Sequence, residues 1–179
     1  MENLPVEFLK WDSDFFGKRI ARITTGCLLE PELHCIFDWA KAERIDCLYY
    51  LASGQETNST GAAETHGFHF MDLRVKFSKD LRKPEKDFIP FWHIRRAVQS
   101  DLDMLKSMAR DAFPFSRFKV DTHFDPVLAD RMYEVWIEKD LQLEGHDVWV
   151  IDVNNELAAF TSVSEKKDGK AQIGLVGTR

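Results

Sequence analysis

The segment VWVIDVNNELAAFTSVSEKKDGKAQIGLVGTR, residues 148–179, predicts three consecutive strands. Short polar stretches divide it into apolar runs that are rich in β-branched residues. The first stretch contains Asn154-Asn155 and the second Asp168-Gly169, pairs that tolerate the positive φ of tight hairpin turns. We therefore expect an antiparallel meander. Its strands are expected at residues 148–152, 157–164 and 171–179.

The residues before this meander predict one strand and two helices. Residues 92–98 alternate as a strand does, and Ser100 is placed to cap the helix that follows. Residues 113–124 are rich in aromatic and charged side chains and predict a loop. Asp125-Pro126 then gives a second helix a cap and a proline at its first position. The buried positions are expected to be Leu102, Leu105, Met108, Ala109 and Ala112 in the first helix and Leu128, Met132, Val135, Trp136 and Leu141 in the second.

The first part of the chain alternates strands and helices. Residues 6–9 and 19–23 read as half-buried strands, and residues 47–52 as a strand covered on both faces. Between them, Pro31 precedes apolar residues at helical spacing, so the pattern predicts a βαβ unit. Residues 62–64 suggest a short helix ended by Gly67. The following run, 68–77, predicts another strand.

A linker is expected at residues 79–87, which are charged, contain Pro84 and lack apolar periodicity. We place a boundary there, with an N-terminal α/β subdomain at 1–87 and a second domain at 88–179. The predicted fold class is α/β (α+β).

The composition excludes several classes of protein. With 179 residues, of which 44% are hydrophobic, the chain can bury a core. A net charge of −6, with both signs mixed along the chain, argues against a nucleic-acid partner. No apolar run is long enough for a signal peptide or a membrane span, so we expect a cytoplasmic protein that acts on a small molecule.

Cysteine and histidine spacing predicts no metal site. Cys27, Cys35 and Cys47 are odd in number and form no C-x-x-C pair, which favours reduced thiols. The histidines show no ligand-like spacing with the cysteines or carboxylates.

Two motifs resemble one branch of the GNAT acetyltransferase superfamily, the sugar-nucleotide amine N-acetyltransferases related to dTDP-fucosamine acetyltransferase, and a third resembles GNAT domains more widely. Trp11–Gly17 reads WDSDFFG, similar to the W-D-S-x-F-F-G element of that branch. Phe115–Phe124 reads FSRFKVDTHF, similar to its S-R-F-x-x-D-x-x-F segment, and Ala129, Met132, Tyr133 and Trp136 follow. Ile94–Ala97 with Asp101-Leu102 resembles the opening strand and helix of many GNAT domains.

This resemblance implies the N-terminal half of a GNAT fold, ending at its fourth strand, after a small α/β subdomain. It implies transfer of an acetyl group from acetyl-CoA to the amino group of a nucleotide-linked sugar, in the supply of surface polysaccharide. The amine would attack the thioester directly, without a covalent enzyme intermediate.

The resemblance also assigns a cofactor strand. Leu175, Val176, Gly177 and Thr178 would contact acetyl-CoA, because the family's corresponding strand pairs with pantetheine and carries a bulge. Glycine would allow close backbone approach there. The alternative is an ordinary edge strand that contains two glycines.

The aromatic loop would bind the acceptor. Its candidates are Phe115, Arg117, Phe118 and Asp121, since a guanidinium suits pyrophosphate and a flat ring suits a sugar or base. In the alternative reading, Phe113, Phe118 and Phe124 join the two helices and Arg117 pairs with Asp121. Catalytic residues stay unassigned. His123 is the candidate base, against a purely structural histidine.

The pyrophosphate loop and the thiolate-protonating tyrosine of the family would follow Arg179. We therefore expect the 179-residue chain alone to bind acetyl-CoA weakly and to turn over poorly. The apolar strand at 171–179 would also leave an edge through which copies of the chain could self-associate into a homo-oligomer. Two other readings stay open, a GNAT enzyme for a peptide N-terminus or polyamine and a non-catalytic binding module.

Overall fold

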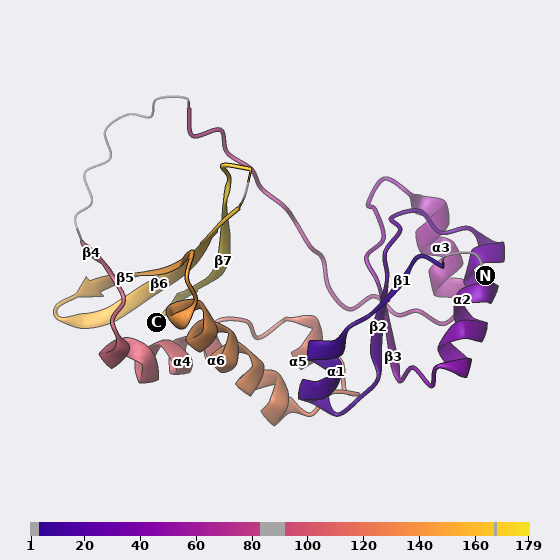
Figure 1. Ribbon diagram of the computed structural model, residues 1–179, viewed down its shortest axis with the longest axis horizontal. Helices are drawn as coiled ribbons and strands as arrows, with labels where there is room; N and C mark the ends of the chain where they lie inside the picture. The colour runs from indigo at the N-terminus through magenta and orange to yellow at the C-terminus, as the bar shows by residue number, and fades with distance from the viewer. Residues whose placement is uncertain (1–3, 83–91, 167) are drawn as a thin grey trace. The chain divides into compact units, whose positions relative to one another are not determined.

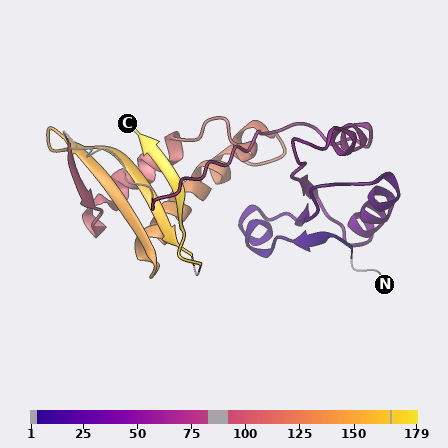
Figure 2. The same cartoon turned by 90° about the horizontal axis from the view of Figure 1, so that it is seen from above.

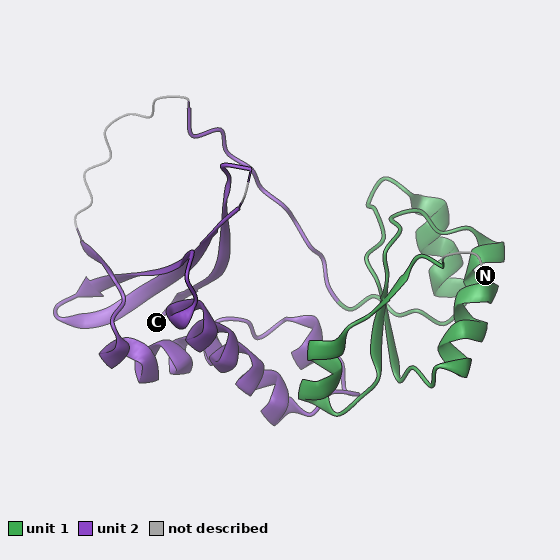
Figure 3. Ribbon diagram, in the orientation of Figure 1, with its two compact units in different colours: residues 1–71 green, residues 72–179 purple. Residues whose placement is uncertain are grey.

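The protein is a mixed α/β chain with two sheets, and its computed structural model describes residues 4–82, 92–166 and 168–179. It divides into two compact units, residues 1–71 and 72–179 (Figure 3). The boundary predicted between residues 87 and 88 lies outside the described residues. Within the described ranges, no helix combines the length and the apolarity needed to cross a bilayer.

Unit 1 contains a three-stranded sheet in the order β1-β2-β3 (Figure 1). β1 (Val6–Phe8) pairs antiparallel with β2 (Ile20–Ile23), and β2 pairs parallel with β3 (Cys47–Tyr50). α2 (Glu30–Ala42) connects the two parallel strands, so the predicted βαβ unit is confirmed. The core is formed by the buried side chains of Ile23, Leu28, Leu33 and Ile36.

The WDSDFFG motif forms the short helix α1 (Lys10–Phe16), which ends at Gly17 with φ +64°. The buried hydroxyl of Ser13 accepts a hydrogen bond from the N–H of Ile20 in β2, at 2.9 Å. Phe16 is buried, whereas Trp11 is exposed and stacks on Phe15. The motif therefore attaches α1 to the first parallel strand.

The last helix of unit 1, α3 (Thr57–Thr65), is longer than predicted, and Gly67 adopts φ +86° just beyond it. The strand predicted at residues 68–77 is wrong, because the structure shows no strand there. Alternation of apolar residues favours an extended chain, but a strand also needs a partner for its backbone groups.

Unit 2 contains a four-stranded antiparallel sheet in the order β4-β5-β6-β7. The strands are β4 (His93–Arg96), β5 (His146–Val153), β6 (Glu156–Glu165) and β7 (Ala171–Thr178). Asn154 and Asn155 adopt φ values of +53° and +63° at the turn between β5 and β6. The predicted meander is confirmed.

The helices of unit 2 lie between β4 and β5 in the chain. They are the 3-10 turn η1 (Gln99–Asp101), α4 (Leu102–Asp111), α5 (Arg117–Val120) and α6 (Pro126–Gln142). α4 and α6 lie side by side against one face of the sheet (Figures 1 and 2). The loop expected at 113–124 thus contains a helical turn, α5.

The helix starts agree only in part with the sequence. Asp125 caps α6 as expected, its carboxylate accepting from the N–H of Val127 at 2.8 Å. Ser100 is not a cap: it lies inside η1, and Asp101 accepts from the N–H of Val98 instead, at 2.8 Å.

The buried stripe of α6 is shifted by about one residue from the prediction. Its fully buried members are Ala129, Met132, Tyr133 and Ile137, whereas Leu128, Val135 and Trp136 are half-buried. The ring of Phe113 stacks on Tyr133 at 4.8 Å, which accounts for the burial of that tyrosine.

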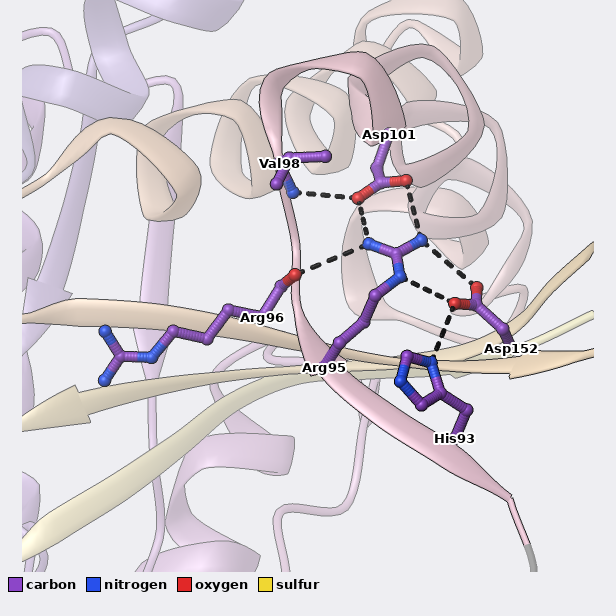
Figure 4. A network of polar contacts seen from close by, with 6 residues as sticks. All are labelled: His93, Arg95, Arg96, Val98, Asp101 and Asp152. Carbon is purple, nitrogen blue, oxygen red and sulfur yellow. Dashed lines mark hydrogen bonds and ion pairs between the residues drawn. The ribbon is translucent and has the colours of Figure 1, made fainter. Parts of the chain in front are cut away.

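A polar network fastens the start of α4 to the sheet (Figure 4). Arg95 of β4 donates to both oxygens of Asp101, at 2.7 and 3.0 Å, and to both oxygens of Asp152 in β5, at 2.6 and 3.2 Å. Hydrogen bonds from the Arg95 guanidinium lower the pKa of Asp101, although partial burial opposes that shift. The same contacts, first with Asp101 and then with Asp152, raise the pKa of Arg95.

Candidate functional site

A pocket of about 460 Å³ lies between α6 and β7 in unit 2. Elements that are far apart in the sequence supply its walls. It is lined by Trp136, Lys139 and Asp140 of α6, Leu143 after that helix, His146 of β5, and Gly174 and Leu175 of β7.

The turn between α6 and β5 brings two titratable side chains together in this pocket. α6 ends at Gln142, and Gly145, at φ +76°, reverses the chain so that β5 begins at His146. The carboxylate of Asp140 lies 2.9 Å from Nδ1 of His146. The side chain of Asp140 is 19% exposed and that of His146 is 30% exposed, so both are partly desolvated and still reachable from the pocket.

β7 contains a bulge on the opposite wall. Thr161 of β6 pairs with Val176 and Val163 with Ile173, so Gly174 and Leu175 together face the single residue Ser162. The buried Ser162 hydroxyl accepts the N–H of Leu175 at 2.9 Å. The bulge therefore has a side-chain hydrogen bond in place of a ladder bond.

Because Gly174 has no β-carbon, β7 can lie close to Ser162 of β6 and to Asp140 of α6. A β-carbon at this position would lie 2.6 Å from Oγ of Ser162 and 3.6 Å from Oδ2 of Asp140. The Asp140 carboxylate is thus in contact with His146 on one side and adjacent to the bulge on the other.

The outer edge of β7 presents main-chain groups. Arg179 donates its N–H to the carbonyl of Ala158, at 2.9 Å, so its main chain faces β6. Because main-chain direction alternates along a strand, the N–H groups of Val176 and Thr178 face away from β6. No strand among the described residues pairs with this edge.

The predicted cofactor residues follow one another along this strand. Leu175 is buried and lines the pocket, whereas Val176 is 51% exposed. A β-carbon on Gly177 would lie 2.4 Å from Cε1 of Phe160 and 3.1 Å from Cβ of Ala112. Phe160 and Ala112 of the protein itself are therefore the groups that pack closely against Gly177.

The predicted acceptor residues do not form one surface. Phe118 is 3% exposed and packs edge-on against Phe124 and Trp136, whereas Phe115 is 82% exposed. The Arg117 guanidinium lies over the Phe118 ring, 4.3 Å from its centroid. The packing of Phe118 against Phe124 agrees with the alternative interpretation, in which these rings join the two helices.

Asp121, the remaining acceptor candidate, contacts the candidate base His123. Asp121 accepts from the N–H of His123 at 2.9 Å, and its carboxylate lies 2.8 Å from Nδ1 of the same residue. The His123 side chain is 84% exposed, and it does not line the pocket.

The loop nevertheless contributes to the pocket indirectly. Phe118 and Tyr133 both pack against Trp136, with ring centroids 6.5 and 5.4 Å away, and Trp136 lines the wall. Burial raises the pKa of the Tyr133 phenol, which therefore stays neutral near pH 7.

Asp140, His146 and Gly174 were not predicted as site residues. One signal was available for the first two: an aspartate in the last turn of a predicted helix, followed by Gly145 and a histidine that opens the next strand. Gly174 had no such signal, because its role depends on the register of the bulge.

Comparison with protein-family models and with curated protein sequences gives no match. In the described ranges, no three His, Cys, Asp or Glu side chains are grouped as a metal site would require.

Proposed function

We propose that this protein is a GNAT-type N-acetyltransferase that transfers the acetyl group of acetyl-CoA to the amino group of a nucleotide-linked sugar. The arrangement of unit 2 supports this proposal. A strand, two helices on one face and a three-stranded antiparallel meander follow in the order that the sequence resemblance implies.

The observation that carries the proposal is the bulged edge strand beside the pocket. The outward N–H groups of Val176 and Thr178 suit the amides of an extended pantetheine arm, which can pair with a strand edge as a peptide does. The bulge at Gly174 and Leu175 lies where the arm's thioester would meet the pocket.

The pocket has the chemistry that an amino sugar needs. Trp136 offers an apolar ring face for the sugar, and the Asp140 carboxylate attracts an ammonium group. The resemblance assigns the nucleotide's pyrophosphate to Arg117, which is outside the pocket lining and whose fork of donors matches two phosphate oxygens.

A substitution on the outer edge tests the cofactor assignment. Val176→Pro removes one outward N–H and leaves the β6 side of the ladder intact, since proline is tolerated on edge strands. Val176→Ala keeps that N–H and is the matched control. Acetyl-CoA affinity is measured by calorimetry on the protein at the length its natural gene encodes. We expect Val176→Pro to bind about tenfold more weakly than Val176→Ala, the loss of one hydrogen bond.

Transfer is then followed by mass spectrometry with dTDP-fucosamine, a terminal peptide amine and spermidine as acceptors. Acetylation of dTDP-fucosamine supports the proposal, and acetylation of only the peptide or spermidine identifies a GNAT enzyme for another amine. A protein that binds no acetyl-CoA is not an acetyltransferase, and the proposal is then wrong.

A further inference from the structure

We propose that His146, held by Asp140, is the general base that takes the proton from the attacking amine. This inference rests on the proposed function and assigns a role within its site. His146 and Asp140 lie outside every motif that carries the family resemblance.

The contact between the two side chains fixes the tautomer of the imidazole. A carboxylate only accepts hydrogen bonds near neutral pH, so the 2.9 Å contact requires the proton on Nδ1 of His146. Nε2 then carries the free lone pair. A histidine oriented by a carboxylate in this way is a common arrangement for accepting a proton.

The position of the pair relative to the bulge suits this role. Oδ2 of Asp140 lies 3.6 Å from where a Gly174 β-carbon would be, so the pair lies beside the strand that would hold the thioester. An amine bound in the pocket would lie between His146 and that strand. Its position matches that of a nucleophile that must meet both a base and a carbonyl carbon.

The pocket lining holds few charged residues besides the imidazole. From α6, Asp140 and Lys139 line the same pocket. On β6 the residue paired with His146 is the neutral Ser164, and β7 contributes Gly174 and Leu175.

The bound ammonium first loses one proton to solvent. Nε2 then takes a proton from the neutral amine nitrogen, which forms a bond to the carbonyl carbon while the carbon–sulfur bond breaks. The thiolate of CoA leaves with the electron pair of that bond. The imidazolium returns its proton to solvent or to the thiolate, so the products are an amide and free CoA. In this scheme His146 is a catalytic residue and Asp140 a positioning residue.

The test compares His146→Gln and Asp140→Asn with wild type at the natural full length. His93→Gln is the control, since His93 is in the same unit with its side chain 75% exposed. Transfer from acetyl-CoA to dTDP-fucosamine is measured between about pH 6 and 9, where a histidine base titrates.

We expect kcat/KM of wild type to fall at acid pH as one group is protonated. In His146→Gln this fall at acid pH should disappear, and kcat/KM should be about 10²–10⁴-fold lower than in wild type. Asp140→Asn should lower kcat/KM, because the imidazole loses the carboxylate that orients it at 2.9 Å, and His93→Gln should keep the wild-type profile. Acetyl-CoA affinity should stay the same in all three variants.

Nitrogen NMR of the wild-type imidazole gives a readout that needs no variant to fold. Above the titration we expect a proton on Nδ1 and none on Nε2, and the opposite tautomer would overturn the inference. If the wild type transfers acetyl and His146→Gln shows the same fall in kcat/KM at acid pH, His146 is not the base, but the proposed function still holds. A wild type that transfers no acetyl group refutes the proposed function, and the assignment falls with it.

Discussion

The hydroxyl of Ser162 accepts the main-chain N–H of Leu175 at 2.9 Å, and this hydrogen bond fixes the bulge of β7. Ser162 is 1% exposed, so water does not replace its hydroxyl if that group is removed. The geometry of the pocket wall therefore depends on one buried side chain of the neighbouring strand.

Ser162→Ala should lower the free energy of unfolding by about 1–3 kcal/mol, because it leaves the Leu175 N–H buried without a partner. Chemical denaturation measures the change. Thr161→Val is the matched control, since Oγ1 of Thr161 is buried with no hydrogen-bond partner among the described residues. Equal losses in both variants would show that the hydroxyl of Ser162 does not support the bulge.

Gly177→Ala should destabilise the sheet. The new β-carbon would meet the Phe160 ring at 2.4 Å, and overpacking of this kind costs about 1–3 kcal/mol. Hydrogen exchange of β6 and β7 amides reports the loss locally. Gly61→Ala is the control: nothing lies within 4 Å of its added carbon, and alanine should stabilise α3 by about 0.5–1 kcal/mol. Unchanged exchange in Gly177→Ala would contradict the packing described for Phe160.

The network around Arg95 predicts a loss of stability at acid pH (Figure 4). Arg95 lowers the pKa of Asp101 in the folded state. The stability from this shift is complete above the unfolded-state pKa of about 3.9, and it is lost as the pH falls through the lower folded-state pKa.

Asp101→Asn should flatten this part of the stability profile. Urea denaturation between about pH 2 and 6 measures it, because this range spans the titration of an aspartate. Asp103→Asn is the control, as Asp103 is also in the first turn of α4, whereas the carboxylates that Arg95 binds in the described part of the chain are those of Asp101 and Asp152. A profile for Asp101→Asn that falls as steeply as that of wild type would contradict the role given to this network.

The turn between β5 and β6 should accept glycine. Asn154 and Asn155 both adopt positive φ, which L-residues reach only at an energetic cost. Asn155→Gly should raise the free energy of unfolding by up to about 1 kcal/mol, whereas Asn155→Ala should lower it by a similar amount. Thermal unfolding separates the two, and the same sign in both variants would argue against strain at this residue.

Local patterns predicted the parts of unit 2 that depend on neighbours in sequence. The three meander strands, the Asn154-Asn155 turn and the Asp125 cap follow from residue type and spacing alone. The strand expected at 68–77 failed because alternation supplies no pairing partner.

The candidate site was predicted only at Leu175, because the site is built by tertiary contacts. Asp140 and His146 meet only after Gly145 reverses the chain, and Gly174 matters only in the bulged register opposite Ser162. Neither contact corresponds to a repeat or a residue spacing that can be recognised in a single sequence.

Phe115 and Phe118 illustrate the same limit, and together they test the acceptor loop. The resemblance implies one role for both rings, but Phe115 is 82% exposed and Phe118 is 3% exposed between Phe124 and Trp136. Phe118→Ala should cost about 3–5 kcal/mol of stability, whereas Phe115→Ala should change it by less than about 0.5 kcal/mol. Thermal and urea unfolding measure both.

If the loop binds the acceptor, Phe115→Ala should raise KM for the acceptor while leaving stability and acetyl-CoA affinity as in wild type. That combination arises only from a ring that contacts substrate, because a packing residue would alter stability as well. An unchanged KM would restrict the acceptor to the pocket between α6 and β7. Phe118 would then act on it only through its contact with Trp136.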